Sequence, residues 1–178
     1  MSTIIFVTGN VNKLNEAKGI LGNKYNIINK KVDLPEIQSV DVEEVVKEKI
    51  KEAYKILKSP CFVEDTGLYI KKLNGFPGAL IKFYYEYLNN TGICKQTGGS
   101  KAYVETIIGY YNGKKIIILK GILNGTISKK PKGNKGFGWD PIFIPNGKKK
   151  TLAELDFKEK NKISARYKAF LKLKKILK

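Results

Sequence analysis

The chain has 178 residues and a formal net charge of +18, from 34 lysines and arginines against 16 acidic residues. It contains no histidine, which excludes His-based catalytic triads, His metal ligands and imidazole general bases. The length fits a single domain spanning residues 1–178 that can bury a core without disulfide bonds.

The first third of the chain predicts alternating strands and helices. Short β-rich runs alternate with segments in which apolar residues recur at helical spacing. Strands are expected at 4–7, 25–28 and 61–63, and helices at 11–21 and 42–57. Pro60 ends the second helix. The third strand leads directly into Glu64-Asp65-Thr66-Gly67, so the acidic pair is expected just after the strand ends.

The rest of the chain predicts a hairpin and a long terminal helix. After a loop at 74–78, an aromatic-rich helix is expected over 79–88. Strands at 102–110 and 114–119 flank Asn112-Gly113, and the second is expected to continue through Thr126. A glycine-rich loop at 133–138, a strand at 142–144 and a helix from 159 to the end complete the list. This order predicts an α/β fold with a mixed sheet.

A turn at Thr8-Gly9-Asn10 connects the first strand to the first helix. Glycine lets a backbone approach a ligand, and Lys13 adds positive charge one turn into the helix. The segment suits a phosphate, although it lacks the spacing of a P-loop. An ordinary strand-to-helix turn would read the same way.

Glu64 and Asp65, with Glu36 as a third carboxylate, form an acidic group. Charged side chains after a buried strand need a metal, water or a partner. Carboxylates together with substrate phosphate suit Mg²⁺, and one of them could orient a water. A helix cap or a salt bridge to a lysine is the alternative.

Two segments near the C-terminus could recognise a base. Gly136-Phe137-Gly138-Trp139-Asp140 carries the only tryptophan, and aromatic faces in a loop suit base stacking or simply anchor the loop. Lys160, Ser164 and Arg166 lie near the start of the last helix. Arg166 is the only arginine, and its planar fork can meet two acceptors where lysine cannot. A solvated amphipathic helix is the alternative.

The cysteines, the lack of targeting signals and the spread of the lysines predict a cytoplasmic protein. Cys61 and Cys94 have no metal-like spacing, which favours free thiols in a reducing cytoplasm. Neither a secretory signal nor a membrane-spanning stretch is predicted. The lysines are spread along the chain, which favours a solvated surface over a dedicated nucleic-acid site, although a basic nucleic-acid-binding domain stays open as an alternative.

Taken together, six ordered motifs resemble the inosine triphosphate pyrophosphatase family, also called HAM1-like. The motifs are Thr8-Gly9-Asn10-x-x-Lys13, Leu34-Pro35-Glu36, Val63-Glu64-Asp65-Thr66-Gly67-Leu68, Leu73-Asn74-Gly75-Phe76-Pro77-Gly78, Phe137-Gly138-Trp139-Asp140-Pro141 and Glu159-Lys160-Asn161-x-x-Ser164-x-Arg166. The resemblance implies a two-lobed α/β fold with an elongated mixed sheet flanked by helices, and a homodimer. It also implies Mg²⁺-dependent hydrolysis of ITP, dITP and XTP to the monophosphate and pyrophosphate.

The resemblance also implies roles for individual residues. Asp65, Glu36 and Lys13 would be catalytic, and Glu36, Asp65 and Glu64 would serve the metal. The substrate-binding residues would be Thr8, Gly9, Asn10, Lys13, Lys49, Thr66, Phe137, Gly138, Trp139, Asp140, Lys160, Ser164 and Arg166. No membrane and no specific nucleic-acid partner are expected.

One position departs from the family pattern. The family usually reads Ser-His-Arg where this chain has Ser164-Ala165-Arg166, and no other histidine can substitute. Two alternatives therefore stay open beside the main function: a changed base preference, and a member with weakened catalysis.

Overall fold

The computed structural model describes residues 2–177 and contains one seven-stranded mixed sheet with the strand order β2-β1-β3-β5-β6-β7, while β4 pairs with β3. The strands are β1 (Ser2–Val7), β2 (Tyr25–Lys30), β3 (Cys61–Ile70), β4 (Pro77–Gly78), β5 (Lys101–Tyr111), β6 (Ile116–Ile127) and β7 (Phe143–Pro145). The α-helices are α1 (Val11–Leu21), α2 (Val42–Leu57), α3 (Ile81–Thr97), α4 (Phe157–Ile163) and α5 (Ala165–Ile176). The predicted elongated mixed sheet flanked by helices is confirmed.

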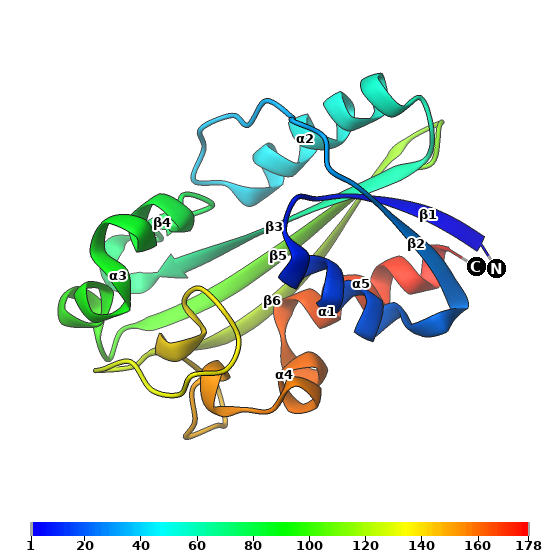
Figure 1. Cartoon of the computed structure of the whole chain (residues 1–178). Coiled ribbons are helices and arrows are strands. Elements are labelled where there is room, and N and C mark those ends of the chain that lie inside the picture. Colours follow the sequence, from blue (N-terminus) through cyan, green and yellow to red (C-terminus); the bar gives the residue numbers. More distant parts are fainter. Residues whose placement is uncertain (1, 178) are drawn as a thin grey trace.

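Helices cover the sheet on both faces. In Figure 1 the long strands β3, β5 and β6 cross the molecule, α2 lies on one face, and α1 and α5 lie on the other. Val46 and Ile50 of α2 pack with Val63 and Ile107 of the sheet, which explains the apolar stripe along that helix. A separate apolar cluster surrounds Ile81 and Ile93 near α3 at the far end of the long strands.

The edge of β3 opposite β5 has a break between two partner strands. β1 pairs with β3 only at Cys61 and Phe62, and β4 pairs only at Leu68 and Tyr69. Within the described residues, the segment 63–67 therefore has a strand neighbour on one side alone, which is β5. This break places the middle of β3 at the carboxyl end of β1, where ligands of α/β sheets commonly bind.

The expectation that the acidic pair follows the end of a strand is wrong. β3 continues through Ile70, because β5 pairs with it along its whole length. Glu64 and Asp65 therefore lie inside a strand, and their side chains point to opposite faces of the sheet.

Two predictions for the later helices need correction. The aromatic-rich helix expected over 79–88 starts at Ile81 and breaks at Asn89, where φ is 51° and ψ is 178°, but a second helical half, which was not expected, continues to Thr97. The C-terminal helix is two helices, α4 and α5, separated at Ser164, whose hydroxyl accepts the backbone N–H of Tyr167 and caps the second. Lys160 and Ser164 consequently do not share the face of one continuous helix.

Other expectations are confirmed. α1 and α2 have the predicted bounds, and β5 pairs with β6 as an antiparallel hairpin. β6 continues through Gly121, where an added Cβ would lie 2.1 Å from the backbone oxygen of Ala165, so glycine allows α5 to pack closely on the sheet. Among residues 2–177, no helix combines the length and apolar character needed to cross a membrane.

Candidate active site

The turn between β1 and α1 leaves a helix N-terminus at the break in the sheet. Asn10 is the N-cap of α1, and its side-chain oxygen accepts the backbone N–H groups of Asn12 and Lys13 at 2.9 and 3.2 Å. The hydroxyl of Thr8 accepts the backbone N–H of Asn10 at 3.1 Å. Because a helix N-terminus carries partial positive charge, this turn can hold an anion.

Lys13 extends from α1 into the break in the sheet. Its ammonium group donates to the backbone oxygen of Glu64 at 3.1 Å and to Asp65 Oδ1 at 3.2 Å. The side chain is only 16% exposed, so this cation is held mainly by protein groups. Lys13 thereby connects the helix N-terminus to the carboxylate of β3.

A second lysine reaches Asp65 from the opposite side. Lys49 of α2 donates to Asp65 Oδ2 at 2.8 Å, and its ammonium nitrogen lies 3.1 Å from Glu36 Oε1. The structure therefore brings together four of the predicted residues, with two carboxylates and two ammonium groups in alternation. We call Lys13, Glu36, Lys49 and Asp65 the open cluster, since each member keeps some contact with solvent.

The charges of the open cluster fix the protonation state of Asp65. Burial would raise the pKa of Asp65, but the ammonium groups of Lys13 and Lys49 lower it, together with the backbone N–H of Thr66, so that the net pKa lies far below the ordinary value. Asp65 is therefore a carboxylate at neutral pH. Lys49 is correspondingly held as a cation, because the carboxylates of Asp65 and Glu36 outweigh the effect of burial and raise its pKa.

Glu64 points to the other face of β3 and has different partners. Its carboxylate accepts Arg166 Nε at 3.2 Å and the hydroxyl of Thr66 at 2.6 Å, and none of its side chain is exposed. The Thr66 hydroxyl also lies 2.9 Å from that of Thr106. Although Lys13 comes within 3.7 Å of Glu64, the two acids of the predicted pair serve separate clusters.

A buried network of charges extends from Glu64 towards the base-recognition residues. Arg166 also donates to Glu16, and Lys160 donates to Glu16 at 2.9 Å and to Asp140 at 2.7 Å. We call Glu16, Glu64, Asp140, Lys160 and Arg166 the closed cluster, because each side chain is at most 8% exposed.

Two carboxyl groups of the closed cluster shift in opposite directions. Burial raises the pKa of Glu16, but Arg166 and Lys160 lower it by more, so the net pKa is below the ordinary value. Burial raises the pKa of Asp140 by more than Lys160 lowers it, and the net pKa is above the ordinary value. The closed cluster thus holds three acids against two cations, and burial favours the neutral form of Asp140.

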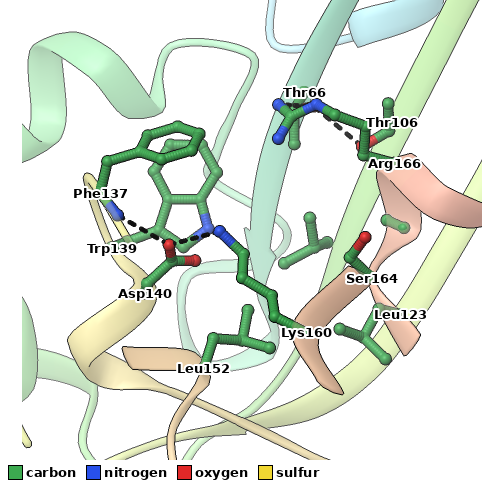
Figure 2. Close-up of a pocket in the computed structure, with 12 residues that line it drawn as sticks. Thr66, Thr106, Leu123, Phe137, Trp139, Asp140, Leu152, Lys160, Ser164 and Arg166 are labelled. Atoms are coloured by element: carbon green, nitrogen blue, oxygen red, sulfur yellow. Dashed lines mark hydrogen bonds and ion pairs between the residues drawn. The ribbon is translucent and has the colours of Figure 1, made fainter. Parts of the chain in front are cut away.

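The glycine-rich loop supplies the aromatic side of a small cavity. Figure 2 shows Phe137 and Trp139 on one side of this cavity and Thr66, Thr106 and Arg166 on another. The Phe137 ring lies 4.7 Å from the ammonium nitrogen of Lys160, a cation–π contact. The cavity has a volume of about 40 Å³, which is room for one or two waters.

Comparisons with known proteins agree with this geometry. Residues 4–176 match the model of the Ham1 family. The chain belongs to the Ham1 family. It is 42% identical to the inosine triphosphate pyrophosphatase of Schizosaccharomyces pombe over 99% of this chain and 96% of that protein. It is also 42% identical to the dITP/XTP pyrophosphatase of Methanopyrus kandleri, over 93% of this chain and 91% of that protein.

A solved structure of the family has the same fold. The HAM1 protein of Coxiella burnetii superimposes with a TM-score of 0.82 and is 28% identical, covering 99% of this chain and 98% of that one. The suspected resemblance to the family is therefore confirmed along nearly the whole chain.

The predicted metal ligands are only partly brought together in this Ham1 protein. Glu36 and Asp65 meet at Lys49, whereas the carboxylate of Glu64 lies on the other face of β3 with Arg166. Among residues 2–177 no group of three or more Cys, Asp or Glu side chains is placed to hold a metal ion. A metal ion held by Glu36, Glu64 and Asp65 stays a prediction.

Sequence reasoning missed several residues of the site. Glu16 carries no motif, and it is the acid that pairs with both Lys160 and Arg166. Its one signal is that it is the only acid of α1, four positions before the buried Ile20. Thr106, Leu123 and Leu152 also line the cavity, and no pattern in the sequence singled them out.

Proposed function

We propose that this chain hydrolyses ITP, dITP and XTP to the nucleoside monophosphate and pyrophosphate, and so removes non-standard purine nucleotides. Membership in the Ham1 family makes it a nucleoside triphosphate pyrophosphatase, a hydrolase of a phosphoanhydride bond. The observation that carries the proposal is the open cluster, which sets an ionised Asp65 between two lysines at a helix N-terminus.

The open cluster fits a divalent cation in the presence of substrate. Glu36 and Asp65 offer hard carboxylate oxygens around one cation, Lys49, and Mg²⁺ commonly binds through one or two carboxylates plus substrate phosphates. Glu36 and Asp65 would hold the ion. When bound, Mg²⁺ neutralises charge on phosphate oxygens and lowers the pKa of a coordinated water. The proposed ligand set leaves Glu64 out because its carboxylate is already engaged by Arg166.

The residues of the open cluster have distinct roles in this proposal. The ammonium groups of Lys13 and Lys49 bind the triphosphate, helped by the partial positive charge at the N-terminus of α1. Asp65 accepts a hydrogen bond from the attacking water and orients it towards the α-phosphorus. The water oxygen forms the new P–O bond, and the bond to the bridging oxygen breaks as pyrophosphate leaves. The carboxylate of Asp65 also accepts the proton that this water releases.

Base selection falls to the side chains around the small cavity. Phe137 and Trp139 offer stacking faces, and Lys160, Ser164 and Arg166 offer donors to a 6-keto group, which adenine lacks. In the structure the Arg166 fork is turned to Glu16 and Glu64, so reading of the base by Arg166 stays a prediction.

A panel of nucleotides tests the proposal. Pyrophosphate release is measured with ITP, dITP, XTP, GTP and ATP in Mg²⁺, and again after chelation with EDTA. We expect ITP, dITP and XTP to be hydrolysed far faster than ATP, and all rates to fall on chelation. Equal rates on ITP and ATP would contradict the base selectivity, and full activity in EDTA would contradict the metal dependence.

Weakened catalysis is the second candidate, favoured by Ala165. Its side chain lines the cavity and supplies no donor, acceptor or charge. Under this alternative Ala165→His raises kcat/KM for ITP, whereas an unchanged value shows that the position is dispensable here.

The homodimer also stays a prediction, and light scattering of the purified chain tests it.

A further inference from the structure

The break in α3 is built by hydrogen bonds. Asn89 has a φ of 51° and a ψ of 178° inside a helix, a backbone conformation that is strained for any residue except glycine. Its side-chain oxygen accepts the backbone N–H groups of Thr91 and Gly92 at 2.9 and 3.1 Å, as an N-cap does. The first half of α3 therefore stops at Leu88, and a second half starts with Asn90.

This restart turns Asn90 towards the glycine-rich loop. Its side-chain Nδ2 donates to the backbone oxygen of Gly138 at 3.0 Å. Gly138 has a positive φ of 61° and stands between Phe137 and Trp139, the two aromatic residues of the cavity. The side chain of Asn90 in α3 thus holds the backbone of Gly138, between Phe137 and Trp139.

Among residues 2–177, the oxygen of the Asn90 side-chain amide lacks a hydrogen-bond donor. The Oδ1 atom of Asn90 is buried, and none of the described residues donates a hydrogen bond to it. A buried acceptor without a partner disfavours folding, so an apolar side chain of similar size would fill this space at lower free energy. The bond to Gly138 is what the asparagine supplies and an apolar side chain would not.

The hydrogen bonds within the glycine-rich loop do not involve Gly138. Asp140 Oδ2 accepts the backbone N–H of Phe137 at 2.8 Å, and the backbone N–H of Asp140 bonds to the oxygen of Phe137 at 3.2 Å. These contacts close the loop on itself around Gly138 without joining it to the far end of the sheet. Trp139 joins the loop to that end by apolar contact, since it packs against the cluster that contains Ile93 and Cys94 of α3, and Asn90 of the same helix adds a hydrogen bond.

We propose that Asn90 is a positioning residue, which fixes the backbone of Gly138 so that Phe137 and Trp139 are set for the base before a nucleotide binds. Asn90 is absent from the residues that line the cavity, and it acts through the loop. The effect on catalysis rests on the proposed function, whereas the effect on the loop does not.

The chain offers a direct reporter of the loop. Trp139 is the only tryptophan, so fluorescence excited selectively over tyrosine comes from the residue next to Gly138. In Asn90→Leu and Asn90→Asp, which both lack the donor, we expect a red shift of emission and stronger quenching by acrylamide without any nucleotide present. Gln96→Leu is the matched control, since this amide of α3 bonds to Tyr84 and makes no hydrogen bond to the loop, and its spectrum should match the wild type.

Kinetics separate positioning from a general loss of structure. With folding checked by circular dichroism, we expect the two Asn90 variants to raise KM for ITP about fivefold and to leave kcat within about twofold, the size expected for one lost hydrogen bond. Unchanged Trp139 emission and unchanged KM in folded Asn90→Leu would overturn the proposal. If Asn90→Leu does not fold, Asn90→Asp, whose side chain has nearly the same shape as asparagine, tests the proposal by the same Trp139 emission and the same KM for ITP. If wild type fails to hydrolyse ITP, the proposed function fails, and the fluorescence result still decides the role of Asn90.

Discussion

The open and closed clusters contain the same kinds of side chain and differ in access to solvent. In the open cluster Lys13, Lys49 and Asp65 are 16–17% exposed and Glu36 is 59% exposed, whereas no member of the closed cluster exceeds 8%. The members of a partly exposed ion pair can turn to a ligand, but breaking a fully buried pair is costly. The comparison assigns phosphate chemistry to the open cluster and pre-formed architecture to the closed one.

The largest expected effect is on the stability of the closed cluster. Glu16→Gln leaves Lys160 and Arg166 short of a buried counter-charge, and we expect the free energy of unfolding to fall by about 3–5 kcal/mol. Urea denaturation followed by circular dichroism measures the change. Glu52→Gln, on the exposed face of α2, is the control and should change stability by less than about 0.5 kcal/mol. A similar small loss in both variants would contradict the assignment.

The open cluster should show the reverse behaviour. Lys13→Met removes a cation that meets the triphosphate, and we expect kcat/KM for ITP to fall about a hundredfold. Stability should change little, because the carboxylate of Asp65 keeps Lys49 as a partner. Steady-state pyrophosphate release and urea denaturation on the same preparation provide both numbers. Loss of stability comparable to that of Glu16→Gln would place Lys13 with the structural group.

Arg166→Lys tests whether the single arginine reads the base as well as holding Glu64. Lysine keeps the charge and removes the fork, so we expect the ratio of kcat/KM for ITP over ATP to fall about tenfold. The panel of nucleotides measures this ratio. If stability falls and the ratio stays as in the wild type, Arg166 serves the closed cluster alone.

The smallest effect is the response to acid. The folded-state pKa of Asp65 and that of Glu16 are lowered, so the stability they contribute is present above their unfolded values near pH 4 and is lost as pH falls towards the folded values. We expect the free energy of unfolding from urea denaturation to decline as the pH falls below about 4. Asp65→Asn should make the decline shallower, and an unchanged slope would contradict the lowered pKa.

Local sequence predicted the open cluster better than the closed one. The turn at Thr8 to Asn10 and the paired acids of β3 each carry a short-range pattern, so their meeting at the break in the sheet could be expected. Glu16 is joined to Lys160 and Arg166 across 144 and 150 residues, and such contacts exist only after α1, α4 and α5 pack.

The missed helix break at Ser164 has a related cause. Ser164 caps α5 through a side-chain hydrogen bond, without proline or glycine at the break itself. Serine is also compatible with continued helix, so a hydrophobic pattern that runs across it conceals the interruption. The length of β3 was underestimated because its pairing with β5 depends on a strand about 40 residues later in the chain.

Glu64 and Asp65 are neighbours in sequence with opposite assignments, so they give the most direct test. Turnover of ITP and the free energy of unfolding are measured for Asp65→Asn and Glu64→Gln side by side. We predict that Asp65→Asn loses activity by about a thousandfold and keeps most of its stability. Glu64→Gln should lose about 3–5 kcal/mol of stability, because Arg166 then keeps only Glu16 of its two buried counter-charges. Full activity in Asp65→Asn, or equal losses of stability in both variants, would contradict the division into two clusters.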